Sequence, residues 1–364
     1  MKTTRPVSTL QFTLMVSAFQ ISVAFLSLPR ELARQAGTDG WIAIFFGWGM
    51  ATLASVVLVK VMKNSPNGSI LELIKRFMGV WASKIAAVIF IAYYLLLAYD
   101  GFMIASLVMK LWLLPSTYIY VLVLLLLIPT YQIAQHGFQA IGRYCEIVTL
   151  ISIWIPFVYL STLRHAHWLY LLPVLKEGWL PVLSTVKIMF FPMVGIGLVF
   201  FIYPHLVNKE KALKAMVISN TLTCLVYLGI TLVCFVYFSP DEIGEFNDPV
   251  ISIMKSIELQ FIERVEVPFI AFYLFVFSCV WIPSMHLVSM NSAWLLGRGG
   301  ERGSLVVWCF AIAVSFFIYK PSFIDAARVN NFLSLTGFVM EFALPVCLLL
   351  YVAIAKKVRG GRRS

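Results

Sequence analysis

Apolar runs long enough to cross a lipid bilayer recur along almost the whole of this sequence. A transmembrane helix needs about 20 mostly apolar residues. In hydrocarbon every backbone N–H and C=O must find a partner within the protein, so such runs fold as helices. We therefore expect an all-α polytopic membrane protein with ten transmembrane helices, at residues 10–33, 41–61, 82–110, 118–135, 145–163, 182–205, 215–238, 268–294, 305–319 and 332–355.

The composition excludes a soluble globular protein. Of the 364 residues, 61% are hydrophobic and 12% are charged, and the mean hydropathy is +0.90, whereas soluble domains average about 25% charged residues. The net charge of +11 comes from basic residues in short loops and in the C-terminal tail, so we ascribe it to membrane topology and expect no nucleic-acid partner. The six cysteines fall in apolar runs without metal-binding spacing, and we expect neither a metal nor another cofactor.

The distribution of Lys and Arg predicts the orientation. If the N-terminus is cytoplasmic, most basic residues fall on the inner side, and the loop at 239–266 on the outer side is net acidic. This bias follows the positive-inside rule, so we expect both termini in the cytoplasm. The acidic loop is a plausible contact for a partner domain, or else a solvated lid.

Two of the ten apolar runs do not read as uninterrupted helices. The first has small and β-branched residues in its middle and then Pro29, and the sixth contains Pro192, Gly195, Gly197 and Pro204. Interrupted helices in corresponding positions of two halves indicate a transporter-type binding site at the bilayer midplane. The alternative is that the small residues only allow close helix packing.

Where a helix unwinds in the membrane, its free N–H and C=O groups must face a cavity or a ligand. Exposed N–H groups suit a carboxylate, and exposed C=O groups suit an ammonium, so an amino acid fits such a site. The residues that we expect to bind the ligand are Gln20, Ile21, Ser22, Val23 and Ala24 in the first break and Met193, Val194, Gly195, Ile196 and Gly197 in the sixth.

The ten spans divide into two halves, one at about 1–165 and one at about 180–364, within a single transmembrane domain covering 1–364. Each half opens with an interrupted span and carries an amphipathic segment before its third span, at 66–79 and at 249–261. Because each half has an odd number of spans, the second half must be inverted relative to the first. This is the 5+5 inverted repeat of the LeuT-like fold, with interrupted helices 1 and 6.

Two acidic residues, Asp100 and Glu341, lie inside predicted spans, where an ionisable group is a functional hypothesis by default. They are candidates for proton coupling, and Asp100 could instead pair with a ligand ammonium; the alternative for both is a structural pairing or a hydrated vestibule. Tyr94, one turn and a half before Asp100, and Ser278 with Cys279 in the eighth span are further candidates to line the pocket. No nucleophile elbow, P-loop or zinc-binding helix motif is present, so we expect no enzyme.

Four stretches resemble one known family, in order and at matching spacings. They are LSLPRELARQAGTDGWI (26–42), LLPVLKEGWLPVL (171–183), FIYPHLVNKEKALK (201–214) and FIERVE (261–266). They are similar to the B subunits of spore germinant receptors (GerAB type), in the amino acid permease superfamily. The chain departs from the family in its sixth break, where many members carry a Glu and this chain has Gly195 and Gly197.

The resemblance implies a multi-pass protein of the spore inner membrane that works with an A subunit and a C subunit, the latter a lipoprotein. It implies that a small germinant, often an amino acid, binds at the breaks in helices 1 and 6 and triggers germination. The alternative is a proton-coupled amino acid transporter of the same superfamily, which would use Asp100 or Glu341. A subunit with a vestigial pocket is a third hypothesis, since the family's acidic residue is absent from the sixth break.

Overall fold

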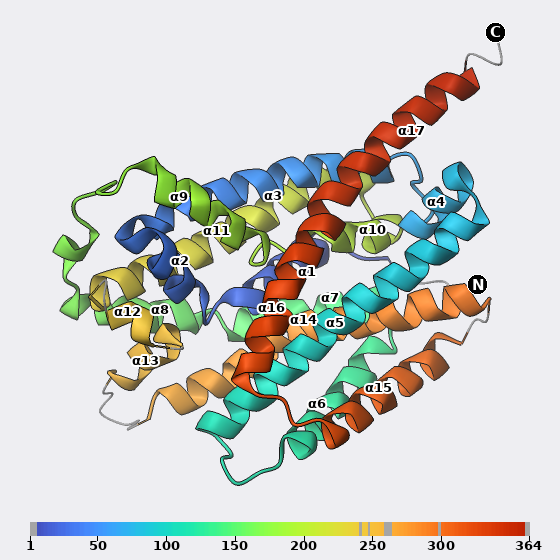
Figure 1. Cartoon of the computed structure of the whole chain (residues 1–364). Coiled ribbons are helices and arrows are strands. Elements are labelled where there is room, and N and C mark those ends of the chain that lie inside the picture. Colours follow the sequence, from blue (N-terminus) through green and yellow to red (C-terminus); the bar gives the residue numbers. More distant parts are fainter. Residues whose placement is uncertain (1–5, 240–241, 247, 258–263, 298–299, 361–364) are drawn as a thin grey trace.

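The computed structural model of the chain describes residues 6–239, 242–246, 248–257, 264–297 and 300–360, with every side chain in them except those of Val23 and Arg359. In these ranges the backbone forms helices and turns, apart from one isolated β-bridge between Val7 and Leu206. The helices pack into an elongated bundle (Figure 1).

The first half of the chain supplies five spans (Figure 1). The predicted interruption of the first span is confirmed, and the predicted amphipathic helix within 66–79 forms α4 (Ile70–Met78) between the second and third spans. The spans are α1 (Thr9–Ala24) with α2 (Leu28–Ala36), α3 (Gly40–Met62), α5 (Val80–Trp112), α6 (Ile119–Ala134), and α7 (Phe138–Ile151) with α8 (Trp154–Ser161).

The second half supplies five more spans, and its first one is again split. Of the predicted amphipathic segment at 249–261, Pro249–Lys255 forms α13, and residues 258–261 lie outside the described part of the chain. A further short helix, α12 (Glu242–Glu245), precedes α13. The spans are α9 (Trp179–Thr185) with α10 (Val199–Ile202), α11 (Ala212–Tyr237), α14 (Glu266–Leu296), α15 (Glu301–Ile318), and α16 (Phe323–Gly337) with α17 (Leu344–Gly360).

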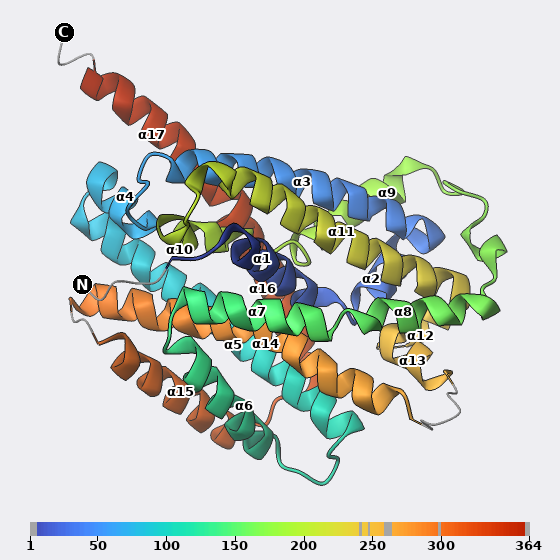
Figure 2. The same ribbon diagram turned by 180° about the vertical axis from the view of Figure 1, so that it is seen from behind.

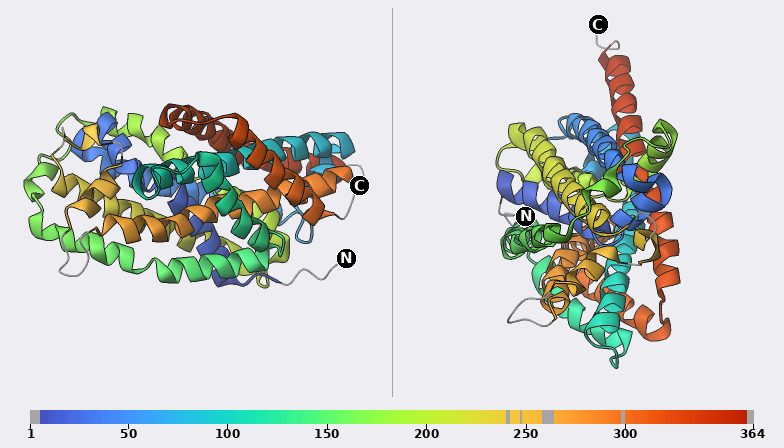
Figure 3. Two further views of the ribbon diagram at one scale, coloured as in Figure 1. Left: turned by 90° about the horizontal axis from the view of Figure 1, so that it is seen from below. Right: turned by 90° about the vertical axis from the view of Figure 1, so that its left-hand side faces the viewer.

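Length and composition agree with ten crossings. Within the described residues, seven helical stretches are long and apolar enough to cross a membrane, and α1, α6 and the pair α9 and α10 supply shorter apolar helices for the remaining three. The start of α1 and the end of α17 lie at the same end of the bundle, and α2, α9, α12 and α13 gather at the opposite end (Figures 2 and 3). The chain is a multi-pass membrane protein with a broken span at the start of each half.

The two broken spans are joined at the end where the chain begins. The backbone N–H of Val7 donates to the carbonyl of His205 at 2.8 Å, and the N–H of Val207 donates to the carbonyl of Val7 at 3.1 Å. Ser8 then starts α1 through a reciprocal capping box with Gln11. The start of the first span and the end of the sixth are therefore one hydrogen-bonded unit.

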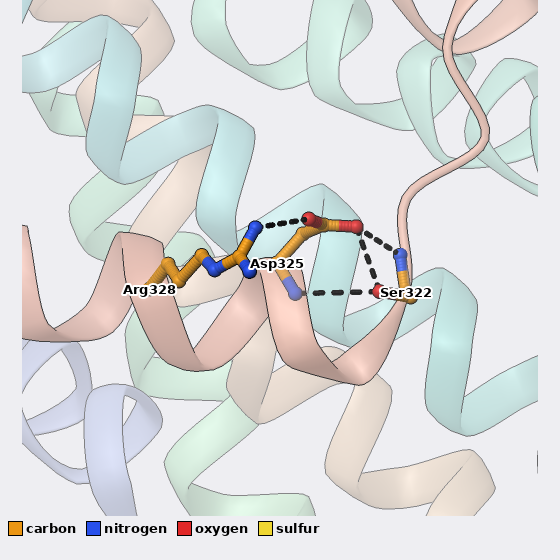
Figure 4. A network of polar contacts seen from close by, with 3 residues as sticks. All are labelled: Ser322, Asp325 and Arg328. Carbon is orange, nitrogen blue, oxygen red and sulfur yellow. Dashed lines mark hydrogen bonds and ion pairs between the residues drawn. The ribbon is translucent and has the colours of Figure 1, made fainter.

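The tenth span begins nine residues earlier than the sequence predicted, at Phe323 and not at Phe332. The cause is local (Figure 4): the Ser322 hydroxyl accepts from the backbone N–H of Asp325, and the Asp325 carboxylate accepts from the backbone N–H of Ser322 at 2.9 Å. Arg328 lies 3.7 Å from the same carboxylate. This capping box extends the helix into a polar sequence that hydropathy alone leaves outside the membrane.

The bundle is centred on the packing of α14 against α5. Gly101 leaves room for Trp281, because a Cβ at residue 101 would lie only 3.1 Å from the indole ring. The indole stacks on Phe102 with ring centroids 5.0 Å apart, and its Nε1 donates to Thr130 Oγ1 at 2.9 Å. One buried side chain thus holds α5, α6 and α14 together.

We expect Trp281→Ala to lower the free energy of unfolding by about 3–5 kcal/mol, the usual cost of removing a buried aromatic ring. Denaturant titration of the purified protein in mild detergent measures this change. The matched control is Trp81→Ala, because Trp81 is 79% exposed and its loss costs about 0.5 kcal/mol or less. Equal effects of the two substitutions would contradict the central role of Trp281.

Candidate functional site

The break in the first span lies later in the chain than the sequence analysis placed it. Residues 20–24 are the last turn of α1 and remain helical, and the chain turns at 25–27 before α2 begins. The Ser22 hydroxyl donates back to the Ala18 carbonyl at 2.5 Å, so this small residue is accommodated within the helix. Pro29 sets the position of the break, because its ring has no N–H and clashes with the carbonyl four residues earlier, at Phe25.

The sixth span is broken at the predicted residues. The chain turns at 191–195 and continues through a 3₁₀ turn, Ile196–Leu198, into α10. Gly195 has a φ of +120°, a conformation that side chains rarely allow, and a Cβ there would lie 2.7 Å from the ring of Phe19 on α1. The two broken spans therefore touch at Gly195.

The carboxylate of Glu341 fills the break in the sixth span. Its Oε2 accepts hydrogen bonds from the backbone N–H groups of Gly195, at 2.7 Å, and Gly197, at 2.9 Å. Its Oε1 accepts from the hydroxyl of Tyr93 at 2.9 Å. Glu341 is 1% exposed and lies in a π-helical turn, Phe338–Ala343, between α16 and α17. The acidic residue that the sixth span lacks is thus supplied by the tenth.

Gln20 connects the two breaks and α11 through its amide. Nε2 donates to the Met193 carbonyl at 3.2 Å and to Asn220 Oδ1 at 3.1 Å, and Oε1 accepts from Thr223 Oγ1 at 2.8 Å. The Tyr227 hydroxyl donates to the Gln20 carbonyl at 2.5 Å. These bonds use the groups of Gln20 that we expected to meet a ligand, so in this structure Gln20 is a cross-link between helices.

Asp100 borders the same small space as Ser22 in the last turn of α1 and Phe191 at the start of the sixth break, without a cationic partner in the described part of the chain. Its side chain on α5 is 5% exposed, and no ion pair in the described residues involves it. With the Asn330 amide in the orientation that satisfies its hydrogen bonds, Nδ2 donates to both carboxylate oxygens of Asp100 at 3.0 Å. A space of about 10 Å³ borders Asp100, Ser22 and Phe191, and this is about the volume of one water molecule.

The other predicted site residues divide into two groups. Ser22, whose hydroxyl also donates to the Val276 carbonyl, and Val194, which contacts Gly337, lie at the interfaces around the breaks. Tyr94 packs on Phe201. Three predicted residues lie away from the small space at Asp100. Ile21 lines a separate apolar cleft, the Ser278 hydroxyl is hydrogen-bonded to the Tyr144 hydroxyl at 2.6 Å, and the Cys279 sulfur lies 3.8 Å from the Cys145 sulfur. Val23 is in α1, but its side chain is outside the described structure.

The sequence analysis missed four polar residues that the structure brings to the site. They come from α5, α11 and α16, and each bonds to one of the predicted residues: Tyr93, Asn220, Thr223 and Asn330. A usable signal was present in the polar cluster at 219–223, which interrupts an apolar span, because Asn220 and Thr223 are three residues apart in it and therefore lie on one face of a helix.

Two interrupted helices, at the starts of two five-span halves, define the fold class of secondary transporters. Solved transporters share it. MhsT in complex with L-phenylalanine matches with a TM-score of 0.63 at 13% identity, over 96% of this chain and 99% of that chain. Mhp1, a nucleobase-cation-symport-1 family transporter in a closed conformation with bromovinylhydantoin bound, matches with a TM-score of 0.62 at 12% identity. The match covers 93% of this chain and 78% of the Mhp1 chain. The LeuT-like fold expected from the sequence is confirmed.

Sequence relatives then narrow the class to one family. The profile of the family described as Spore germination protein matches residues 6–324, and the chain belongs to this family. It is 23% identical to spore germination protein GerQB of Bacillus cereus over 347 residues, 94% of each chain. It is 22% identical to spore germination protein A2 of Bacillus subtilis (strain 168) over 359 residues, 96% of each chain. This family and fold are those of receptors and transporters and not of enzymes.

We expect Glu341→Leu to destabilise the protein more than Glu341→Gln. The leucine leaves two buried backbone N–H groups and the Tyr93 hydroxyl without an acceptor, and each unsatisfied group costs about 1–3 kcal/mol. The glutamine side chain has the same length and keeps one acceptor oxygen for these donors. Thermal unfolding of both variants in detergent measures the difference, and equal stability of Glu341→Leu and the wild type would show that the carboxylate does not support the break.

Proposed function

We propose that this chain is the nutrient-sensing B subunit of a spore germinant receptor, and that its ligand carries an amino group that binds Asp100 between the first and sixth breaks. The observation that carries the proposal is the buried Asp100 carboxylate without a cationic partner among the described residues. An acidic residue at mid-membrane is costly unless it is paired or protonated. A ligand ammonium supplies the missing positive charge.

Glu341 limits the ligand chemistry at the other break. Its carboxylate already occupies the N–H groups of Gly195 and Gly197, which are the donors that a ligand carboxylate would otherwise use. The remaining donors are those at the start of α2, where Ser27 makes no side-chain cap. An amine is thus the one group that every ligand of this site needs, and a carboxylate is optional.

Ligand binding requires the site to open. The space beside Asp100 holds about one water molecule, which is far smaller than an amino acid. Of the segments that border it, the turn at 191–195, which contains Phe191, is the one outside a regular helix. Movement of this turn makes room for the ligand and gives the A and C subunits a conformational change to read.

The orientation and partners follow the same proposal. The start of α1 and the end of α17 lie at the end of the bundle where Lys209 Nζ donates to Asn67 Oδ1 at 2.8 Å and Lys356 Nζ donates to Asn64 Oδ1 at 2.5 Å (Figure 3). We assign this basic end to the cytoplasmic side of the spore inner membrane, because basic loops remain on the inner side. The opposite end, with the exposed acidic residues Glu242 and Glu245 of α12, is then the outer side and a contact for a partner domain.

A second candidate function is proton-coupled amino acid transport. The observation in its favour is Glu341, because a single buried carboxylate contacts the sixth break through Gly195 and the third span through Tyr93. Protonation would weaken its hold on both. Uptake of labelled amino acids into proteoliposomes of the chain alone, abolished by Glu341→Gln, favours the transporter; ligand binding without uptake favours the sensor.

The direct test is thermal stabilisation of the purified protein by a panel of probes. The panel contains alkylamines, amino acids, carboxylic acids without an amine, sugars and nucleosides. A compound that raises the melting temperature binds the folded state preferentially. We expect stabilisation only by compounds with an amino group, and a loss of affinity of about tenfold or more in Asp100→Asn, where a close opposite charge is removed.

The control is Glu301→Gln, which neutralises an exposed acidic residue at the start of α15. It should bind as the wild type does. Stabilisation by carboxylic acids or sugars, or unchanged binding in Asp100→Asn, would falsify the amine site. If the isolated chain binds nothing in the panel, the same measurement on the complex with its A and C subunits decides between a site that needs its partners and a vestigial one.

A further inference from the structure

A cleft of about 480 Å³ opens beside α1, separate from the space at Asp100. Its walls are α7 with α8 on one side and α11 on the other, and residues of α1 and α14 form its floor. Figure 2 shows α7 and α11 on either side of α1. The two spaces share no lining residue, so the cleft is a site of its own.

The sequence explains why this space is not filled. Gly229 on α11 borders the cleft, and a Cβ added there would meet nothing within 4 Å. On the opposite wall the fifth span is interrupted at Ser152 and Ile153, between α7 and α8. Pro156 has no N–H to continue the helical bonding to Ser152. A missing side chain and a bent helix together hold the walls apart.

The surface that faces the cleft is apolar, and none of the described residues that line it is charged. The hydroxyls of its polar residues are used within the protein or buried in the wall. Thr149 donates to the Cys145 carbonyl, Tyr159 donates to the Val250 carbonyl, and Ser17 bonds Thr223. Those of Ser152 and Tyr273 have no hydrogen-bond partner in the described structure, but protein atoms cover both oxygens, so they do not face the cleft. An occupant therefore gains from contact and burial of apolar surface, not from hydrogen bonds.

The cleft opens toward the lipid. Its rim consists of apolar side chains that are largely exposed, with Ile153 at 62%, Leu225 at 60% and Leu160 at 53%. Its floor is buried, with Ala18 at 6% and Tyr273 at 2%. In a multi-pass protein the exposed apolar rim lies in the bilayer, so the cleft is continuous with the surface that already contacts lipid chains.

We propose that this cleft holds one hydrocarbon chain of a membrane lipid, packed against α1 as far as Phe25, the first residue of the turn that breaks the first span. Water does not compete for the space, because apolar cavities stay dry. The bilayer surrounds the rim with acyl chains of matching chemistry. A lipid chain in the cleft supports α1 on the face next to the one that carries Ser22, which borders the space at Asp100.

The test uses the full chain in nanodiscs of a phosphatidylcholine that carries a photoreactive diazirine midway along one acyl chain. After illumination, mass spectrometry measures labelling of the floor peptide containing Ala18 and Phe25. Labelling of Phe310 and Phe317, lipid-facing residues of α15, serves as the internal standard. We expect label on the floor at a level comparable with this standard.

The deciding variant is Gly229→Phe, whose ring projects into the cleft and narrows it, and its matched control is Gly49→Phe on α3, where an added Cβ also meets nothing within 4 Å but does not face the cleft. We expect Gly229→Phe to lower floor labelling about tenfold, because close-packed atoms exclude the chain, and Gly49→Phe to leave it unchanged. If Gly229→Phe does not fold, Gly229→Leu replaces it.

Two results would overturn the proposal. One is a wild type with label on the rim but none on the floor. The other is floor labelling that persists in Gly229→Phe at the level of the wild type. A floor that reacts with a small free diazirine alkane but not with the lipid would show that the occupant is a small apolar molecule and not a lipid chain, which also overturns it.

Discussion

The broken sixth span depends on one carboxylate. Unwinding a helix at mid-membrane exposes N–H groups that have no water to bond, and Glu341 supplies their acceptor from the tenth span. The same side chain accepts from Tyr93 on the third span. The third, sixth and tenth spans thus meet at one ionisable group. The length and position of the Glu341 side chain therefore determine how these spans are arranged at the site.

The remaining polar side chains follow the same constraint. Gln20 satisfies Met193, Asn220 and Thr223 across the two broken spans and α11, and Asn330 donates to Asp100. After this pairing, two buried carboxylates at the site have no cationic partner in the described part of the chain, Asp100 and Glu341. Glu341 accepts three hydrogen bonds from neutral donors, whereas Asp100 accepts only from Asn330, so Asp100 is the acid with more to gain from a ligand cation.

The sequence predicts the breaks, but only part of their chemistry. Ten spans and the interruption of the sixth could be read from hydropathy, proline and glycine, because these act locally. The first break could not be placed by small residues, because Ser22 remains helical by bonding to Ala18, and Pro29 acts four residues upstream. The partner of Gly195 lies 146 residues away, so no local pattern could show that Glu341 would replace the acid missing from the sixth span.

The bridge between Val7 and the residues around Leu206 has a mechanical consequence. Because the start of the first span and the end of the sixth are fastened there, the two broken spans share a fixed point and can separate only by pivoting about it. The segments α2 and α9, at the opposite end of the bundle (Figures 2 and 3), then move through the larger arc. A partner that binds at Val7 would hold the pivot, and a partner at the opposite end of the bundle would follow the movement.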